Sequence, residues 1–446
     1  MTNRGVFYGW VVVATAFICL FAAYGVWNSF PVFYVAILDE FGWSRSSTVL
    51  TTSIFAGVYA LSAPLTGGAI DRFGPRVVMP LGAITLGLGL LATSRVSELW
   101  QLYLTYGLLA AAGESMVGTI ANLSVLARWF SRRRGTAIGL ASSGIGVGAL
   151  LLVPAAQWII TNHGWRTAYT ALGVFIVATI PALTLAFQRG RPEEMGLLPD
   201  GDRPKGQQVA GGRARPQLRL VDAQWAGTAW TVRSALATRR FWLLFCTFML
   251  ATTSHAAIWT HIVAYLNGKG FDPLLGASVV GFIGICSSFG KIAWGWLSDR
   301  IGREGAYSLG MSSMVGGVLI LSTVADASQT WPVYFYAALF GLGFGAFNPV
   351  ASSSAADLFQ GKRFGSIYGG LWVGTGVGSS LGPWVSGLLF DWTGAYNLSL
   401  VLSATAACLS AAGMWLAAPR RVRQVPGVAA RAQKAAVSPT PSTRDA

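Results

Sequence analysis

Long apolar runs joined by short polar connections fill most of this chain. Twelve runs hold about 20 residues or more, which is enough for a helix to cross the hydrocarbon core of a bilayer. The first run follows Arg4 and is too long for the core of a signal peptide, so we interpret it as a retained helix. The predicted spans are 9–37, 46–70, 77–95, 99–125, 135–161, 166–188, 241–267, 274–297, 305–325, 331–356, 365–389 and 395–417.

One long polar stretch, residues 189–238, interrupts this pattern after the sixth span. It is rich in Gly, Pro, Gln and Arg, a composition typical of a partly disordered linker. The linker separates a first six-helix bundle, residues 1–188, from a second, residues 239–418. The remainder, 419–446, is rich in Ala, Pro and Arg, and we expect a disordered tail there.

Composition supports a protein that spans a membrane several times. Charged residues make up 11% of the chain, against about 25% in soluble domains. Hydrophobic residues reach 53% and the mean hydropathy is +0.53. These values exclude a cytosolic enzyme, a secreted disulfide scaffold and a disordered chain. The four Cys lie in apolar runs without metal-ligand spacing, and no nucleotide-binding or hydrolase motif occurs. We therefore expect no metal, no cofactor and no enzymatic activity.

The net charge of +15 follows from topology. If the N-terminus lies inside, 27 of the 32 Lys and Arg residues fall on the cytoplasmic side, as the positive-inside rule requires. Both termini are then cytoplasmic, and nucleic acid is not needed to explain the charge. We expect a multi-pass protein of the plasma (inner) membrane with the lipid bilayer as its partner. Arg outnumbers Lys and Ala is abundant, which favours a bacterial source.

The two halves of the chain repeat one another. GGAIDRFGPR at 67–76 follows the second span, and GWLSDRIGR at 295–303 follows the eighth, with the Asp residues 228 positions apart. Five glycines between 135 and 148 match five between 365 and 378 at an offset of 230. A parallel duplication explains both offsets. Two six-helix halves related by an axis along the membrane normal form one of the known transporter plans.

These motifs resemble the loop signatures of the major facilitator superfamily, and the resemblance covers all twelve spans. The segments FYGWVVVA, DEFGWSRS, ARWFSRRRGTAIG and HIVAYLNGKGF are similar to one branch, the monocarboxylate transporters and oxalate/formate antiporters. The resemblance implies an all-α membrane protein of twelve helices in two pseudo-symmetric bundles. It also implies secondary transport by alternating access.

Both copies of the loop signature predict a conformational latch. Each carboxylate ends a span beside arginines, so ion pairs can hold the helix ends in one state and release them in another. The glycines allow the helices to approach closely. The candidate latch residues are Gly67, Asp71, Arg72, Gly74 and Arg76 in the first half, and Gly295, Asp299, Arg300, Gly302 and Arg303 in the second.

Two ionisable residues lie deep inside predicted spans, where a charge is costly unless it serves a cavity or a partner. Lys291 precedes Asp299 by eight residues, about 12 Å along a helix, which places it near the midplane. A cation there attracts an anion. The related family has an Arg at this position, and the resemblance implies that this Arg anchors the carboxylate of the family's substrates. Glu114 lies at similar depth in the fourth span, as a candidate proton carrier, counter-ion of Lys291 or structural carboxylate.

Further polar and aromatic side chains are candidates for the same cavity. His261, within the family-like HIVAYLNGKGF, can bind a carboxylate or take up a proton, and His255 is a second candidate for proton coupling. Where proton-coupled relatives have an Asp and a Lys, this chain has Ser287 and Asn28, so their coupling scheme does not transfer directly. The candidate substrate-binding residues are Lys291, His261, Asn28, Tyr24, Asn348, Tyr368 and Trp372.

We therefore expect a monomeric secondary transporter of a small organic anion, a monocarboxylate or a short dicarboxylate, with protons as the candidate coupling ion. One alternative is a proton-coupled exporter of cationic or amphipathic drugs, in which Glu114 would attract the cation. A second alternative is a membrane sensor or receptor with a transporter-like body that does not transport.

Overall fold

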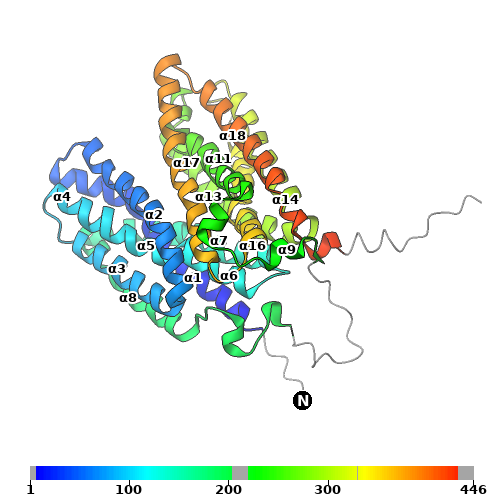
Figure 1. The fold of residues 1–446 in the computed structure, drawn as a ribbon. Coiled ribbons are helices and arrows are strands. Elements are labelled where there is room, and N and C mark those ends of the chain that lie inside the picture. The colour runs from blue at the N-terminus through cyan, green and yellow to red at the C-terminus, as the bar shows by residue number, and fades with distance from the viewer. Residues whose placement is uncertain (1–6, 203–218, 329, 430–446) are drawn as a thin grey trace, which may run out of the picture.

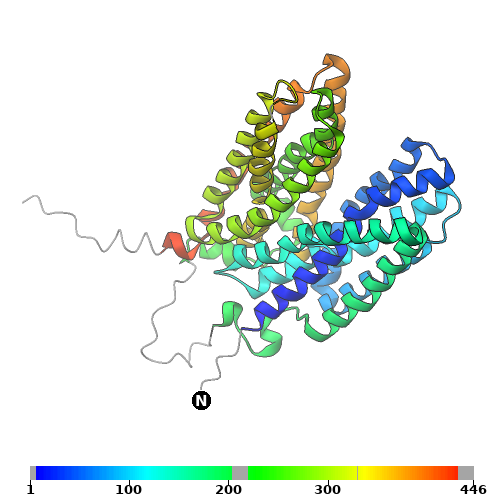
Figure 2. The same cartoon turned by 180° about the vertical axis from the view of Figure 1, so that it is seen from behind.

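Two helical bundles lie side by side, converge at one end and diverge toward the other (Figures 1 and 2). The computed structural model describes residues 7–202, 219–328 and 330–429. The linker segments and the described C-terminal segment both lie at the convergent end (Figure 1). Asp71 and Asp299 also lie there, so we name it the latch end.

The first bundle contains helices that begin and end close to the predicted spans. Small residues bring them together: a Cβ added at Gly144 or Gly148 would come within 2.4 Å of a backbone oxygen of the first helix. The elements are α1 (Gly9–Phe41), α2 (Arg45–Phe73), α3 (Pro75–Thr93), α4 (Leu99–Leu102), η1 (Tyr103–Ala110), α5 (Ala111–Val117), α6 (Thr119–Trp129), α7 (Arg134–His163) and α8 (Trp165–Phe187).

The second bundle repeats this arrangement. Its elements are α11 (Arg239–Trp259), α12 (Ile262–Gly268), α13 (Pro273–Ile301), α14 (Arg303–Ser322), α15 (Thr330–Phe344), η4 (Phe347–Ala351), α16 (Ser352–Phe359), α17 (Phe364–Thr393) and α18 (Asn397–Ala417). Within this bundle α17 packs against α11, and α14 packs against α15 and α18.

Eleven helical runs in the described chain are long and apolar enough to cross a membrane. They correspond to eleven of the twelve predicted spans. The twelfth prediction, 365–389, coincides with α17, a 30-residue helix that is not among the eleven. Its length suffices for a crossing, but its many Gly, Ser and Trp residues lower its hydropathy. Those small residues face helices of both bundles.

Three spans are interrupted rather than regular. The fourth contains the π-helical turn η1 and then breaks at Gly118, where the backbone is extended. The tenth, its counterpart in the repeat, breaks after α15 and continues through the π-helical turn η4. The seventh breaks at Thr260 and His261, between α11 and α12. Discontinuous helices in transporters expose backbone groups near the midplane, which makes these breaks candidates for a site.

Pairs of glycines join the two bundles toward the latch end. A Cβ added at Gly67 of α2 would lie 1.9 Å from the carbonyl oxygen of Gly365 in α17. The equivalent pair is Gly135 of α7 and Gly295 of α13, where the distance is 2.4 Å. Farther along, a Cβ at Gly57 or Gly281 would have no neighbour within 4 Å. The bundles therefore touch along the latch half of these helices and separate beyond it.

The linker and the C-terminal segment pack against the latch end. The linker forms η2 (Pro192–Met195), η3 (Pro199–Gly201), β1 (Arg219–Leu220), α9 (Ala223–Gly227) and α10 (Val232–Leu236). The C-terminal segment forms η5 (Pro419–Arg421) and β2 (Arg423–Gln424), and β2 pairs antiparallel with β1.

Residues 419–429 are folded, where we expected a disordered tail. Val422 is fully buried and Val425 is 3% exposed, so apolar burial offsets the entropy of ordering this polar-rich segment. The expected disorder of 430–446, and of 203–218 within the linker, falls outside the described residues.

Candidate transport site and latch

Asp71 bridges the two bundles at the latch end. Its carboxylate accepts the backbone N–H groups of Gly365 and Ser366, at 3.0 and 2.8 Å, and the Ser366 hydroxyl at 3.0 Å. These amides open α17, so a carboxylate of the first bundle caps a helix N-terminus of the second, where the helix dipole favours negative charge. Arg128 of α6 donates to the same carboxylate from within the first bundle.

Asp299 makes the mirror arrangement. It accepts the backbone N–H groups of Gly135 and Thr136 at the start of α7, at 3.0 and 2.9 Å, and the Thr136 hydroxyl at 2.8 Å. Arg303 pairs with it at 2.7 Å. The internal repeat has thus produced two reciprocal caps, one donated by each half.

A buried charge network strengthens the second cap. Asp357 of α16 pairs with Arg134 of α7 at 2.5 Å and with Arg303 of α14 at 3.0 Å. Asp357 is 1% exposed and Arg134 is fully buried. Removing one partner of such a network costs about 3–5 kcal/mol, because the remaining charges stay buried and uncompensated. The contact between Arg134 and Asp357 crosses between the bundles.

The latch differs from its prediction in its arginines. Both aspartates, and Gly67 and Gly295 beside them, lie at the interface between the halves. Among the arginines of the loop motifs, Arg303 pairs with an aspartate of the latch. The others make different contacts: Arg72 lies over the Phe73 ring, Arg76 donates to the Leu185 carbonyl, and Arg300 lies 3.7 Å from the Trp296 ring centroid.

Sequence reasoning missed Arg128, Arg134 and Asp357 as latch residues. They lie at the ends of the fourth, fifth and tenth spans, where a charged residue is expected in any polar loop and gives no sign of a special role. Gly74 and Gly302 serve the turns that follow each aspartate, with φ of +77° and +107°, a region that favours glycine.

Lys291 lies in α13 where that helix crosses α7. Its carbonyl oxygen would be 2.2 Å from a Cβ added at Gly139, so the two backbones nearly touch there. The residue is 6% exposed. Among the described residues its ammonium has neither an ion-pair partner nor a hydrogen-bond partner. A buried cation without a partner is costly, so this position favours a bound anion.

Glu114 ends the α5 segment just before the break at Gly118. It is fully buried, and neither carboxylate oxygen has a hydrogen-bond partner among the described residues. The described structure holds no ion pair between Glu114 and Lys291. It lies within electrostatic reach of the hydroxyls of Tyr24, Tyr59 and Tyr106.

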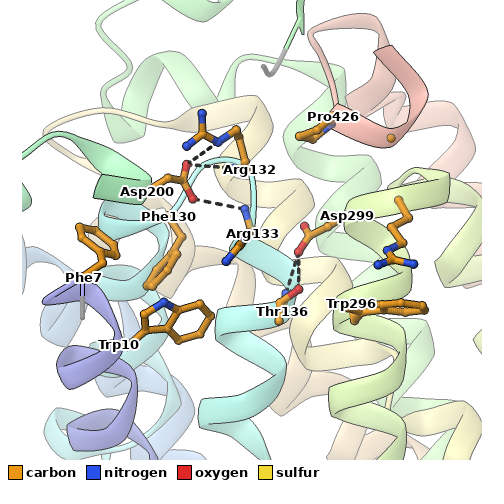
Figure 3. Close-up of a pocket in the computed structure, with 12 residues that line it drawn as sticks. Phe7, Trp10, Phe130, Arg132, Arg133, Thr136, Asp200, Trp296, Asp299 and Pro426 are labelled. Carbon is orange, nitrogen blue, oxygen red and sulfur yellow. Dashed lines mark hydrogen bonds and ion pairs between the residues drawn. The ribbon is translucent and has the colours of Figure 1, made fainter. Parts of the chain in front are cut away.

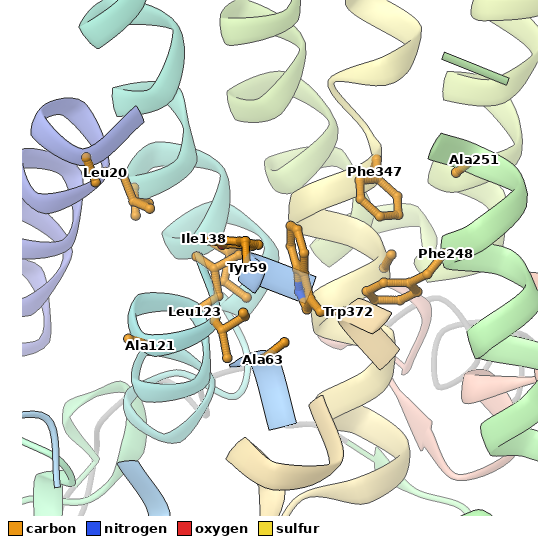
Figure 4. Close-up of a cluster of buried hydrophobic side chains, with 14 of the residues drawn as sticks. Leu20, Tyr59, Ala63, Ala121, Leu123, Ile138, Phe248, Ala251, Phe347 and Trp372 are labelled. Carbon is orange, nitrogen blue, oxygen red and sulfur yellow. The ribbon is translucent and has the colours of Figure 1, made fainter. Parts of the chain in front are cut away.

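A pair of tyrosines lies between the first bundle and the interface with the second. The Tyr24 hydroxyl lies 3.2 Å from that of Tyr59 and 2.7 Å from that of Thr119. The ring of Tyr59 approaches the ring of Trp372, from the opposite bundle, with centroids 6.4 Å apart. Figure 4 shows Trp372 between Tyr59 on one side and Phe347 on the other. Tyr59 was not among the predicted site residues.

Three predicted residues of the second bundle lie in this region. Tyr368 and Trp372 are one turn apart on α17, with rings 6.2 Å apart, and the Tyr368 hydroxyl lies 2.6 Å from that of Ser352. The indole nitrogen of Trp372 and the side-chain oxygen of Asn348 are buried without a hydrogen-bond partner among the described residues. These buried atoms leave hydrogen-bonding capacity unused in this conformation, which is costly unless another state or a ligand uses it.

The two histidines of the seventh span point to different places. His255 stacks on Phe344 at 3.7 Å and lies within electrostatic reach of Lys291. His261 instead faces the interior of the second bundle, where its Nε2 lies 3.1 Å from the Pro383 carbonyl and its ring lies near Tyr396. The two rings therefore lie in different surroundings, with His255 among aromatic side chains and His261 at the Pro383 carbonyl.

Asn28 shares a helix face with Tyr24, as its spacing predicted. Its amide donates to the Tyr24 carbonyl at 2.7 Å, and the side chain is exposed. The described residues hold no cluster of three or more His, Cys, Asp or Glu suited to a metal ion.

Comparison with known proteins agrees with this architecture. A family model described as Major Facilitator Superfamily matches residues 16–335 and 279–443. The outward conformation of the transporter FucP has a TM-score of 0.69 at 14% identity, over 91% of this chain and 98% of that one. The human organic anion transporter MFSD10 has a TM-score of 0.68 at 14% identity, over 92% and 99%.

Curated relatives narrow the family. Monocarboxylate transporter 13 of Rattus norvegicus is 31% identical over 414 residues, which cover 92% of this chain and 89% of the relative. Monocarboxylate transporter 11 of Homo sapiens is 28% identical over 423 residues, which cover 93% and 83%. Both relatives are mammalian, so they give the expected bacterial source no support. They are membrane transporters and not enzymes. The chain belongs to the major facilitator superfamily and, within it, to the monocarboxylate transporter family.

Proposed function

We propose that this protein moves a small organic anion, a monocarboxylate or a short dicarboxylate, across the membrane by alternating access. The observation that carries the proposal is Lys291. It is a buried cation without a partner among the described residues, on a helix at the interface between the two bundles. A carboxylate would supply the missing negative charge, and the mostly apolar surroundings would strengthen that attraction.

Lys291 binds the carboxylate as a point charge, because an ammonium lacks the planar two-pronged geometry of an arginine. The indole of Trp372 and the amide of Asn348 offer further polar contacts, since each has an unpartnered atom. Aromatic rings of Tyr59 and Phe347 flank Trp372 and suit a short apolar substituent on the anion. We assign substrate binding to these residues, with Tyr24 and Asn28 beside them.

The latch supplies the conformational step. With both aspartate caps made, the bundles are joined at the latch end and apart at the other, which corresponds to an outward-facing carrier if the latch end is cytoplasmic. Breaking the caps of Asp71 and Asp299 would let the bundles part at this end. The glycine pairs would then separate, and substrate at Lys291 would reach the cytoplasm.

Proton coupling falls to Glu114, with His255 as a second candidate. Glu114 is buried and has no hydrogen-bond partner among the described residues, so its carboxyl group is free to take up a proton. When both are ionised, Glu114 and Lys291 carry no net charge together, which lowers the cost of moving the empty carrier through the membrane.

Uptake of labelled lactate or oxalate into proteoliposomes, with and without an inward proton gradient, tests the proposal. Lys291→Ala should abolish uptake, and Lys291→Arg should retain it because the charge remains. Lys362→Ala, an exposed lysine at the latch end, is the matched control and should behave like the parent. Carboxylate uptake by Lys291→Ala at the parent rate would refute the anchor role.

The same assay separates the alternatives. Glu114 favours a cationic substrate as the second candidate, because a buried carboxylate without a partner attracts a cation as well as a proton. Competition by organic cations rather than by carboxylates would favour the drug exporter. Absence of counterflow for both classes would favour a sensor that does not transport.

A further inference from the structure

A large cavity lies at the latch end, apart from the residues assigned to substrate binding and proton coupling. Its volume is about 780 Å³, within the range of sites that bind small molecules. Its lining residues come from both bundles, the linker and the C-terminal segment (Figure 3). They are Phe7, Trp10, Phe130, Arg132, Arg133, Thr136, Asp200, Trp296, Asp299, Arg300, Pro426 and Gly427.

Aromatic rings form two opposite walls of this cavity. On the first-bundle side, Trp10 and Phe130 pack with ring centroids 5.1 Å apart, and Phe7 lies 5.7 Å from Phe130. On the second-bundle side, Trp296 carries the guanidinium of Arg300 over its ring. Figure 3 shows Trp10 and Trp296 on either side of Thr136 and Asp299. A planar apolar group can stack on the aromatic rings of the first-bundle side, while Arg300 covers one face of Trp296 on the other side.

The charges that line the cavity favour an anion. Both carboxylates are already used: Asp299 caps α7, and Asp200 accepts the backbone N–H groups of Ser131 and Arg132 at 3.0 and 2.8 Å. Arg132 pairs with Asp202 at 2.6 Å. The exposed guanidinium of Arg133, by contrast, has no hydrogen-bond or ion-pair partner among the described residues. Arg133 is therefore the cation available to a ligand.

We propose that this cavity is a second binding site, which takes a planar aromatic anion from the cytoplasmic solution. The ring system packs on Trp10 and Phe130 and reaches Trp296 across the cavity, and the anionic group contacts Arg133. Since the walls belong to different bundles and the contact of Thr136 with Asp299 lies between them, a bound ligand holds the latch closed. The site thus regulates the carrier from the side opposite to the one open for substrate.

Direct binding to the purified full chain tests this site without any transport measurement. Naphthalene-2-sulfonate is titrated by calorimetry into the protein in nanodiscs of zwitterionic lipid. Cyclohexanesulfonate, which has the charge without the flat ring, and naphthyl trimethylammonium, which has the ring with the opposite charge, should bind at least tenfold more weakly. Equal binding of either control compound would overturn the proposal.

Variants locate the site. Arg133→Gln and Trp296→Leu should each weaken binding about tenfold, the effect expected for a lost charge-assisted contact or stacking contact. Trp296→Phe keeps an aromatic ring and should retain most of the affinity. That result would show that the weaker binding of Trp296→Leu comes from loss of the ring and not from misfolding. Arg363→Gln is the matched control, because Arg363 precedes α17 as Arg133 precedes α7 and does not line the cavity. An equal loss in Arg363→Gln would indicate general attraction to basic loops and refute the site.

Two further arms distinguish other sources of binding. Lys291→Gln should leave the affinity unchanged, which separates the cavity from the transport site; a tenfold loss would place the probe at Lys291 instead and overturn the proposal. Addition of anionic phosphatidylglycerol to the nanodiscs should also have little effect. Competition by this lipid would identify the cavity as a headgroup site and exclude a soluble aromatic anion.

Discussion

Neutralising Asp71 should open the latch end. The two carboxylate oxygens of Asp71 together accept three hydrogen bonds from Gly365 and Ser366. Asp71→Asn keeps one acceptor oxygen but loses the negative charge and the second acceptor. A hydrogen bond to a charged group contributes about 1.5–3 kcal/mol, and the helix dipole adds up to about 1 kcal/mol. Since Asn preserves part of this, we expect a loss of about 2 kcal/mol from the closed arrangement.

That loss corresponds to about a thirtyfold increase in the population with the latch end open. The assay is labelling of Ile138→Cys, a fully buried position of α7 near the latch, by a membrane-impermeant maleimide. The background has alanine at the four native cysteines, two of which are exposed. When opening is faster than labelling, the rate follows the open population and should rise up to thirtyfold.

Two comparisons make this result specific. Asp299→Asn removes the reciprocal cap, and it should raise the labelling rate to a similar degree because its contacts have the same geometry. Asp222→Asn is the control: Asp222 also caps a helix, at Trp225, but within the linker and without a contact between the bundles. Labelling at the parent rate in both latch variants, with the protein folded, would refute the role of the caps.

Three other predictions follow from the same structure. Gly67→Ala should prevent closure and lower the Tm in a thermal melt, since its Cβ would lie 1.9 Å from the Gly365 carbonyl, whereas Gly68→Ala, 3.4 Å from its nearest neighbour, should be tolerated. Asp357→Asn should destabilise the protein by about 3–5 kcal/mol, because two buried arginines lose their shared partner; an unchanged denaturation midpoint would contradict this. Glu114→Gln should remove the effect of a proton gradient on uptake in proteoliposomes while counterflow persists, and retained gradient dependence would exclude Glu114 as the coupling group.

Much of the fold was predictable because a bilayer restricts the alternatives. Only helices and closed barrels satisfy their backbone polar groups in lipid, so apolar runs of about 20 residues predict spans with little dependence on context. The exception, α17, shows the limit of this argument. Its Gly and Ser residues lower its hydropathy but allow the close contacts with α2 and α11, and that packing is visible only in three dimensions.

Sequence reasoning found the two aspartates and one of their partners, Arg303, which pairs with Asp299. Asp71 and Asp299 stood out because their motif occurs in both halves, and a repeat can be recognised from the sequence alone. The backbone amides that they cap lie more than 160 residues away in the chain, at the starts of α7 and α17. The expected pairing with a neighbouring arginine holds for Arg303, whereas packing decided that Arg128 meets Asp71 and Arg134 meets Asp357.

The sequence by itself determined the membrane class, the duplicated plan and the two buried charges, because hydropathy, repeats and costly residues are local properties. Tertiary structure decided that Glu114 and Lys291 do not pair, that His261 lies at the Pro383 carbonyl, and that Tyr59 meets Trp372 across the halves. It also folded residues 419–429 onto the latch end. Each of these outcomes depends on which helix faces contact each other, and that depends on packing between segments distant in the chain.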